Sequence, residues 1–412
     1  MDDFEYSLPT HLVFGHDAEG RVGELVAAHG GSRVLVLYGG GSCVRSGLLD
    51  RVCAALEDAG VVHAELGGVA PNPLSDLVYR GIEAVRADKL DFVLAIGGGS
   101  VIDTAKAVAL GAPYEGDFWD FYGGDAEPER ALPVGVVLTM AASGSEASPD
   151  SVITQAGTML KRETSSRVLL PAFSVLDPAL TETLPAYQTA CGIVDMYSHV
   201  LERYFTRTEA TGVTDRMIEG LMLAIIDEAP RVMADPKSYD ARANLMWAAT
   251  MAHCDVAGVG RTQDWASHDI EYALSSRYGV AHGAGLAIVM PAVERYYLDR
   301  VPASVPRLAQ LARRVWGVEV LDGYTAAALG IERQCDFFAS LGMPATLADI
   351  GGGAGDIAAL AHETCWAGGR RGRVGGYAPF DERPVTEVFR LMLPQTHPLP
   401  DVVCRSRNTS LT

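Results

Sequence analysis

The stretch Phe92-Val93-Leu94-Ala95-Ile96-Gly97-Gly98-Gly99-Ser100 joins a short apolar run to three consecutive glycines. A helical pattern begins directly after it, at Val101-Ile102-Asp103. A continuous apolar run of this length predicts a strand that is buried on both faces of a parallel sheet. Glycines after such a strand let the backbone approach a phosphate, and the N-terminus of the next helix favours an anion. The stretch therefore predicts a strand–loop–helix unit that binds phosphate, although an ordinary tight turn has the same composition.

Two better-known phosphate loops do not fit this stretch. No Gly-Lys-Ser or Gly-Lys-Thr follows the glycines, so it is not the loop of P-loop nucleotide hydrolases. Ile102 stands where the third glycine of a GxGxxG motif would be. The context of the glycines, between a strand and a helix, carries the prediction of phosphate binding.

The same alternation extends over the first 180 or so residues. Two more apolar runs resemble buried strands, namely Arg33–Tyr38 and Val134–Leu138, and a weaker run spans Val61–Leu66. Segments with helical spacing lie between them, for example Leu48–Ala59 and Leu77–Ala87. Strands that alternate with helices predict an α/β domain with a parallel sheet, in which ligands bind beyond the carboxyl ends of the strands.

The pattern changes near Thr183-Leu184-Pro185, which we interpret as a hinge. Beyond it the apolar residues follow a helical period with almost no alternation. The predicted helices span Ala186–Thr206, Val213–Ala234, Tyr239–Ala257, Trp265–Arg277, Gly283–Tyr297 and Tyr324–Leu341. We therefore predict two domains, an α/β domain over residues 1–184 and an all-helical domain over residues 185–412.

Composition excludes several classes of function. The chain has 412 residues, of which 48% are hydrophobic, so it can bury a substantial core. Its 33 basic and 52 acidic residues give a formal net charge of −19, which disfavours binding to nucleic acid or to anionic membrane surfaces. Seven cysteines without a CxxC pair are typical of a reducing compartment, and the N-terminus does not resemble a signal peptide. We expect a soluble cytoplasmic protein without a membrane-spanning segment.

A second glycine loop, Gly39-Gly40-Gly41-Ser42, follows the predicted strand Arg33–Tyr38. Sites that bind NAD usually place an acidic residue near this position, to hold the ribose 2′-hydroxyl. Here a serine hydroxyl and Arg45 are found instead, which favours the 2′-phosphate of NADP. The alternative is an ordinary turn between a strand and a helix.

Four residues have spacings suited to a divalent metal. Asp195 and His199 are four residues apart on a predicted helix, so their side chains share one face. His268 and His282 are fourteen residues apart, and a break at Gly279 would place His282 at the start of the next helix. Three imidazoles and a carboxylate suit Zn²⁺ or Fe²⁺, which can polarise a carbonyl group during hydride transfer. An Asp-x-x-x-His pair alone also occurs on exposed helix faces. Other histidines of the chain lie in scattered or turn-like contexts and are not candidate ligands, namely His11, His16, His29, His63, His362 and His397.

Many ordered motifs give the chain a family resemblance, from about Phe4 to Phe389. They are Tyr38–Ser42, Pro71-Asn72-Pro73, Ala95–Asp103, Leu138-Thr139, Ser143-Gly144-Ser145-Glu146, Leu176-Asp177-Pro178, Gly192–Asp195 with His199, Asp264–His268 and His282–Ile288. With these motifs the chain resembles the iron-containing (group III) alcohol dehydrogenases, especially the butanol-dehydrogenase-like branch of NADPH-dependent aldehyde reductases. The resemblance implies a Rossmann-like dinucleotide-binding domain followed by a helical metal-binding domain, the dehydroquinate synthase-like fold, and commonly a homodimer.

The resemblance also assigns residues position by position. Asp195, His199, His268 and His282 match the metal ligands of the family, which uses Fe²⁺ or Zn²⁺. The positions that match its NAD(P)-binding residues are Gly39, Gly40, Gly41, Ser42, Asn72, Gly97, Gly98, Gly99, Ser100, Asp103, Thr139, Met140, Ser143 and Lys161.

Two features depart from the family pattern. Many relatives carry a histidine four residues after the third ligand, where this chain has Tyr272. On a helix Tyr272 would share a face with His268, so it could orient substrate, relay a proton or simply fill the wall of the site. The run from Gly368 to Gly376 contains Arg370, Arg371 and Arg373, which could receive an anionic substrate but also suits a solvated loop.

These features predict an NAD(P)-dependent alcohol dehydrogenase or aldehyde reductase that acts on a small aldehyde or primary alcohol. A reductase specialised for a small anionic aldehyde is one alternative. Dehydroquinate-synthase-like lyases share the fold but need more lysine and arginine around a phosphorylated substrate than this chain offers. A non-catalytic protein that binds cofactor or metal, with Tyr272 marking lost chemistry, is the remaining alternative.

Overall fold

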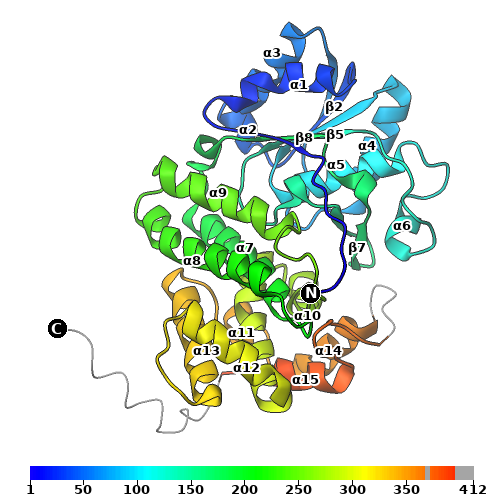
Figure 1. Ribbon diagram of the computed structural model, residues 1–412. Helices are drawn as coiled ribbons and strands as arrows, with labels where there is room; N and C mark the ends of the chain where they lie inside the picture. The colour runs from blue at the N-terminus through cyan, green and yellow to red at the C-terminus, as the bar shows by residue number, and fades with distance from the viewer. Residues whose placement is uncertain (367–371, 395–412) are drawn as a thin grey trace. The chain divides into compact units, whose positions relative to one another are not determined.

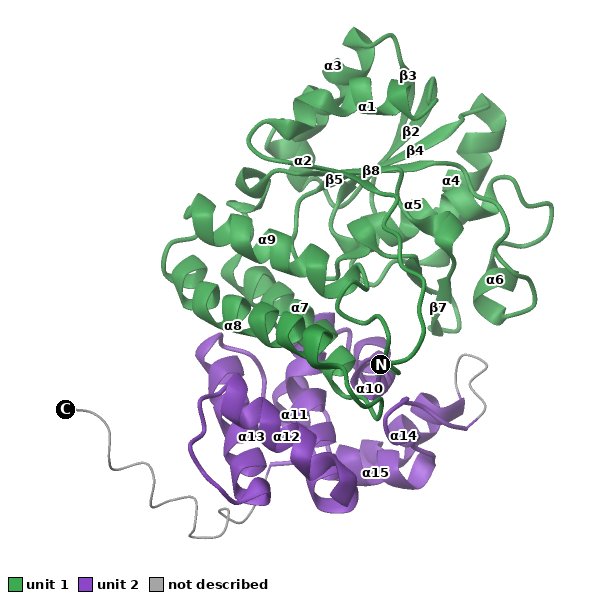
Figure 2. Cartoon of the chain, in the orientation of Figure 1, with its two compact units in different colours: residues 1–263, 367–369 green, residues 264–366, 370–412 purple. Residues whose placement is uncertain are grey.

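The computed structural model describes residues 1–366 and 372–394 of the chain, and Figure 1 shows its ribbon. The described residues form two compact units, coloured separately in Figure 2. Unit 1 spans Met1–Gln263, and unit 2 comprises Asp264–Trp366 together with residues 372–394.

A six-stranded parallel sheet forms the centre of unit 1, with the strand order β1-β8-β5-β4-β2-β3. Its strands are β1 (His11–Phe14), β2 (Arg33–Tyr38), β3 (Val62–Leu66), β4 (Phe92–Gly97), β5 (Val134–Leu138) and β8 (Phe173–Leu176). The two strands β6 (Asp150–Thr154) and β7 (Lys161–Ser165) form a separate antiparallel hairpin. Because all six strands of the main sheet run in one direction, the loops that follow β2, β4 and β5 emerge at the same edge.

Helices cover both faces of this sheet (Figure 1). One face packs against α1 (Val22–Ala28) and α3 (Leu48–Asp58), and the other packs against α4 (Ser75–Asp88) and α5 (Gly99–Gly111). Residues of β4 alternate between the two resulting cores, with Val93 and Ala95 in one and Leu94 and Ile96 in the other. This double burial explains why β4 is apolar throughout.

Unit 1 contains five further α-helices. Two short helices are α2 (Ser42–Arg45) and α6 (Trp119–Gly123), and the long ones are α7 (Ala186–Tyr204), α8 (Gly212–Ala234) and α9 (Tyr239–His253). The three long helices pack against one another, and most of α7 is buried. Unit 1 therefore contains the sheet and the first three long helices of the helical half.

Unit 2 is helical. Its helices are α10 (Ala266–Tyr278), α11 (His282–Arg300), α12 (Val305–Arg314), α13 (Gly323–Ser340), α14 (Ile357–Trp366) and α15 (Glu382–Leu391). Helix α11 packs against α10, α13 and α15, so it forms the centre of the unit. None of the helices in the described part of the chain is long and apolar enough to span a membrane.

The predicted fold class, an α/β region followed by a helical region, is confirmed. The four strands predicted from the sequence correspond to β2, β3, β4 and β5. The apolar runs of the sequence did not predict β1 and β8, which have only four residues each, or the hairpin β6–β7. The compact units divide after Gln263, whereas the change of sequence pattern falls just before α7. A domain boundary after residue 184 remains a prediction.

Candidate functional site

Two of the predicted cofactor loops touch each other at the carboxyl edge of the sheet. The N–H of Thr139 donates to the carbonyl oxygen of Gly97 at 3.0 Å. A Cβ at Gly98 would lie 3.1 Å from the Cβ of Met140, and a Cβ at Gly99 would overlap the hydroxyl of Ser143. These close approaches leave little room for a side chain at Gly98 or Gly99, where the loops after β4 and β5 pack together.

The loop Gly39–Ser42 lies at the same edge of the sheet, after β2. Gly41 has a φ of 97°, a conformation that favours glycine, and α2 begins at the next residue. The guanidinium group of Arg45 folds back beside this turn, at 3.4 Å from the position that a Cβ of Gly41 would occupy. A positive charge and a serine hydroxyl are thus found where the sequence analysis expects the adenosine ribose.

Asn72 and Lys161, two other predicted cofactor positions, lie next to each other. The ammonium group of Lys161 donates to the side-chain oxygen of Asn72 at 3.2 Å. Lys161 begins β7, and the hairpin is held near the turn because the N–H of Thr154 donates to the carbonyl oxygen of Pro73 at 2.8 Å. Residues 89 positions apart in the sequence therefore share one polar contact.

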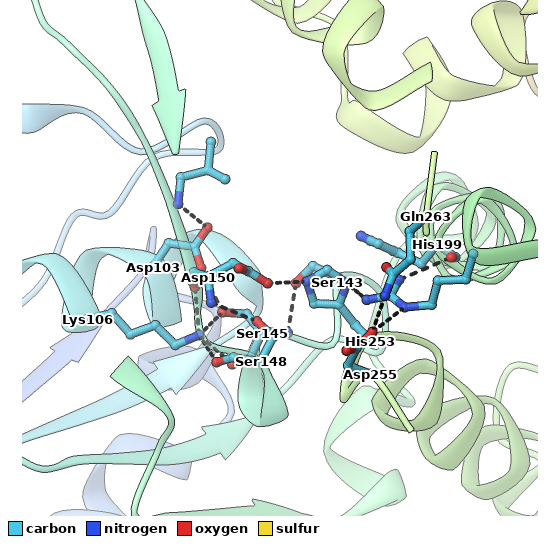
Figure 3. A network of polar contacts seen from close by, with 12 residues as sticks. Asp103, Lys106, Ser143, Ser145, Ser148, Asp150, His199, His253, Asp255 and Gln263 are labelled. Atoms are coloured by element: carbon cyan, nitrogen blue, oxygen red, sulfur yellow. Dashed lines mark hydrogen bonds and ion pairs between the residues drawn. The ribbon is translucent and has the colours of Figure 1, made fainter. Parts of the chain in front are cut away.

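Asp103 and Lys106, both on α5, hold the segment that follows β5 (Figure 3). The Lys106 side chain is fully buried, and its ammonium group donates to the carbonyl oxygens of Ser145, Ser148 and Asp150 at 2.8, 2.9 and 2.8 Å. The Asp103 carboxylate accepts a hydrogen bond from the Ser145 hydroxyl at 2.7 Å. Burial raises the pKa of Asp103 to about 6, although Lys106 and the Ser145 hydroxyl act in the opposite direction. This network fixes the loop that carries Ser143.

His253, which the sequence analysis did not single out, links this segment to the predicted ligand His199. The Nε2 atom of His253 lies 3.0 Å from a carboxylate oxygen of Asp150 (Figure 3). The imidazole rings of His253 and His199 pack edge to face, with their centroids 4.3 Å apart. Arg203 donates to Nδ1 of His253 at 3.4 Å, so Nε2 carries the proton that faces Asp150. Despite burial, the hydrogen bond from His253 lowers the pKa of Asp150. No local spacing reveals this contact, because Asp150 and His253 are 103 residues apart.

Asp195 and His199, the predicted ligands in unit 1, lie one helical turn apart on α7. Both are buried, with 5% of each residue exposed. Their Oδ1 and Nδ1 atoms are 3.6 Å apart. Because zinc–ligand distances are about 2.0–2.2 Å for these atom types, both atoms could bind one ion.

His268 and His282, the predicted ligands in unit 2, come from adjacent helices. Gly279, with a φ of 64°, ends α10, and His282 is the first residue of α11. The interruption considered in the sequence analysis therefore exists. The centroids of the two imidazole rings are 5.1 Å apart. This separation is compatible with two histidines that bind one ion.

Glu271 orients His282, and the sequence analysis missed it. Its carboxylate is fully buried and accepts a hydrogen bond from Nδ1 of His282. With the proton on Nδ1, the lone pair of the imidazole is on Nε2 of His282, the nitrogen that the predicted metal site would use. A side chain at Gly285 would overlap the carboxylate, so this glycine provides the space for Glu271. The position of Glu271 three residues after His268 was the only available sequence signal.

Tyr272 is half-buried beside the same pair, with its ring centroid 5.9 Å from that of His282. Tyr272, which stands where many relatives have a histidine, therefore lies beside the predicted ligand His282. Residues 368–371 of the arginine–glycine run, which include Arg370 and Arg371, lie outside the described residues. The N–H of Gly375 donates to the carboxylate of Asp269 at 3.2 Å, so the described part of this run is attached to the first turn of α10.

Comparisons with known proteins agree with the features of both units. Residues 9–178 match the family model of the iron-containing alcohol dehydrogenases, and residues 189–393 match the model of the C-terminal part of that family. The chain is 43% identical to the probable NADH-dependent butanol dehydrogenase 1 of Bacillus subtilis, over 85% of this chain and 90% of that protein. It is 38% identical to the NADPH-dependent aldehyde reductase YqhD of Escherichia coli, over 87% of this chain and 92% of that protein.

A solved structure is similar over almost the whole length. The crystal structure of the NADH-dependent butanol dehydrogenase A of Thermotoga maritima aligns with a TM-score of 0.92 and 37% sequence identity. The alignment covers 96% of this chain and 99% of that chain.

Proposed function

Since this chain belongs to the iron-containing alcohol dehydrogenase family of metal-dependent oxidoreductases, we propose that it reduces small aldehydes to primary alcohols with NADPH. The reverse reaction, oxidation of the alcohol, uses the same groups. The observation that carries the proposal is the His268–His282 pair, together with the buried carboxylate of Glu271 that orients it.

We assign the metal ligands to Asp195, His199, His268 and His282. One carboxylate and three imidazoles form a donor set that suits Fe²⁺ or Zn²⁺ and not Mg²⁺ or Ca²⁺, which prefer oxygen ligands. When bound, such an ion supplies a Lewis acid that polarises a carbonyl oxygen. The protein contributes the orientation of the ligands, and Glu271 keeps the proton of His282 on Nδ1.

The glycine loops of unit 1 are assigned to the cofactor. Gly97–Ser100 at the N-terminus of α5 would bind the pyrophosphate, and Thr139, Met140 and Ser143 would line the same edge of the sheet. Asp103 would contribute indirectly, because its carboxylate accepts a hydrogen bond from Ser145 and so holds the loop that carries Ser143. Asn72 and Lys161 supply an amide and an ammonium group from the neighbouring turn and hairpin.

The preference for NADPH rests on Gly39–Ser42 and Arg45. The loop has no acidic side chain, and the guanidinium group of Arg45 lies beside Gly41. Relatives with either cofactor in their names are similar to this chain, so the preference needs its own test. We expect Arg45→Ala to raise the KM for NADPH about tenfold and to leave the KM for NADH nearly unchanged, because a charged hydrogen bond contributes about 1.5–3 kcal/mol. An equal change for both cofactors would contradict the preference.

We assign to Tyr272 either substrate orientation or proton relay, because its ring lies beside that of His282. We also propose a homodimer in the cytoplasm, as is common in the family. The six cysteines of the described residues form no disulfide with one another, which supports a reducing compartment. Sedimentation analysis of the purified protein would measure its oligomeric state.

The decisive experiment combines metal analysis with turnover. Purified protein that contains one divalent ion per chain should oxidise NADPH in the presence of at least one member of a panel of short aldehydes. His268→Ala should lose both the metal and the turnover. A panel that yields no NADPH oxidation, together with a His268→Ala variant that behaves as the parent protein does, would contradict the proposed function.

A further inference from the structure

A second group of potential metal ligands lies at the edge of the sheet in unit 1. His63 and Glu65 alternate with Ala64 on β3, so both side chains project from the same face of this edge strand. In the register with β2, His63 pairs with Val34 and Glu65 with Val36, two residues of the core that α3 covers. Helix α3 therefore lies over the face that carries His63 and Glu65.

Cys53 approaches the same two side chains from α3. One potential ligand atom of each residue, the sulfur of Cys53, a ring nitrogen of His63 and a carboxylate oxygen of Glu65, lies within 4.8 Å of the others. Cys53 and His63 are half-buried and Glu65 is exposed, so an ion could enter from solvent. Three donors at this separation can converge on one ion with limited movement of their side chains.

The donor set indicates which ion would bind. A thiolate, an imidazole and a carboxylate are the ligands of Zn²⁺ and of its substitute Co²⁺, whereas Mg²⁺ and Ca²⁺ take oxygen ligands. Three protein ligands leave a fourth position for water. The four assigned active-site ligands include no sulfur, so the two sites differ in a property that can be measured.

The electrostatic surroundings of Cys53 also favour a cation. Burial, followed by the carboxylates of Glu65, Glu57 and Asp50, raises the pKa of the Cys53 thiol to about 11. The same negative charges that disfavour a thiolate attract a divalent ion.

This cluster is adjacent to the loop assigned to the cofactor. Tyr38, the residue before Gly39, donates its hydroxyl to Glu65 at 3.5 Å. Its ring also fills the space next to Gly67, where a side chain would overlap it. An ion that draws Glu65 toward Cys53 would remove the partner of Tyr38 and shift the start of the loop Gly39–Ser42.

We propose that Cys53, His63 and Glu65 form a second metal site of the zinc type, and that its occupancy weakens dinucleotide binding at Gly39–Ser42. The second part of this proposal rests on the proposed function, because it requires that Gly39–Ser42 binds the dinucleotide. The first part does not depend on it.

The test of the metal site uses Co²⁺ added to the protein as purified with its resident metal. Thiolate–cobalt bonds give a charge-transfer absorption in the near ultraviolet, and the active-site ligands cannot produce it. We expect this absorption in the parent protein, its loss in Cys53→Ser, and its retention in Cys335→Ser, which removes a half-buried thiol from unit 2. His63→Ala should weaken Co²⁺ binding by at least about tenfold. This variant tests the same site if Cys53→Ser fails to fold. No absorption in the parent protein, or the same absorption in Cys53→Ser, would overturn the site.

The test of coupling measures NADPH binding by nicotinamide fluorescence with and without added Zn²⁺. Zn²⁺ should raise the dissociation constant at least about fivefold in the parent protein, the lower end of typical coupling between sites, and leave it unchanged in His63→Ala. Equal NADPH affinity with and without Zn²⁺ would overturn the coupling. If NADPH does not bind at all while the cobalt absorption is present, the proposed function and the coupling fail and the metal site stands.

Discussion

The two units each supply two of the proposed metal ligands, but they position them in different ways. Asp195 and His199 lie one turn apart on α7, so helix geometry alone brings their side chains together. His268 and His282 lie on different helices, and their separation depends on the break at Gly279 and on the packing of α10 against α11. The first pair is therefore fixed by local structure, whereas the second pair also requires a correct tertiary fold.

The buried charges that support the two pairs also differ. In unit 1 a single ammonium group, that of Lys106, binds three carbonyl oxygens and a hydroxyl, and His253 joins the same segment to His199. In unit 2 a single carboxylate, that of Glu271, holds His282 directly. We expect loss of Lys106 to affect mainly the stability of the fold, and loss of Glu271 to affect mainly the binding of the metal.

Removal of a ligand from the pair in unit 2 should give the largest effect. His282→Ala should lower kcat/KM by at least about 10³-fold, because a Lewis acid contributes several kcal/mol to transition-state stabilisation. The metal content of the purified protein should fall in parallel. His362→Ala, which changes an exposed histidine of the same unit, is the matched control and should retain metal and activity. Full metal content in His282→Ala would show that unit 2 does not contribute this ligand.

Replacement of the buried ammonium group should test the support in unit 1. Lys106→Met leaves the carbonyl oxygens of Ser145, Ser148 and Asp150 without their donor, so the free energy of unfolding should fall by about 3–5 kcal/mol. Lys237→Met, on an exposed lysine, should change it by less than about 0.5 kcal/mol. Urea titrations of both variants measure the difference. Equal stability of the two variants would mean that the network around Lys106 is not a structural support.

The contrast between the units also explains what the sequence could predict. Strands β2, β4 and β5 were predictable because burial on both faces leaves a continuous apolar run that ends in glycine or threonine. The edge strand β3 is only partly buried and contains His63 and Glu65, so its run is weaker. The ligands were predictable because i,i+4 spacing and family motifs are local signals. The contact of Asp150 with His253 was not predictable, because it joins a residue of a hairpin to a residue of a helix that only the tertiary fold brings together.

A buried acid in unit 2 should make the stability of the protein depend on pH. Burial raises the pKa of Glu294, on α11, from its usual 4.5 to about 8, although a hydrogen bond from Gln334 acts in the opposite direction. The folded state then binds more protons than the unfolded state between these values. This group therefore lowers stability as the pH rises from 4.5 to 8. Glu294→Gln should remove that dependence and stabilise the protein on the order of 3 kcal/mol at pH about 9, with little change at pH about 4.

Thermal unfolding across this pH range measures the effect. Asp336→Asn, on an exposed carboxylate of the same unit, is the control and should keep the pH dependence of the parent protein. A Glu294→Gln variant with the same pH dependence as the parent would show that Glu294 ionises normally. Because α11 also carries His282, this measurement reports on the helix that positions the second pair.

The smallest effect should come from Glu271, and it distinguishes orientation of a ligand from loss of a ligand. Glu271→Ala removes the acceptor of the Nδ1 proton of His282, so the imidazole can turn and present either nitrogen. Metal affinity should fall about 10–100-fold, as is typical when the partner of a histidine ligand is removed. Glu271→Gln retains an acceptor oxygen and should recover part of that metal affinity. Glu319→Gln, which changes an exposed carboxylate of unit 2, is the control and should leave the metal affinity unchanged. Competition with a chelator gives the affinities, and the visible spectrum of the Co²⁺-substituted protein reports the ligand geometry. If Glu271→Ala and the parent protein share both, His282 is held by the packing of α10 against α11 without a contribution from Glu271.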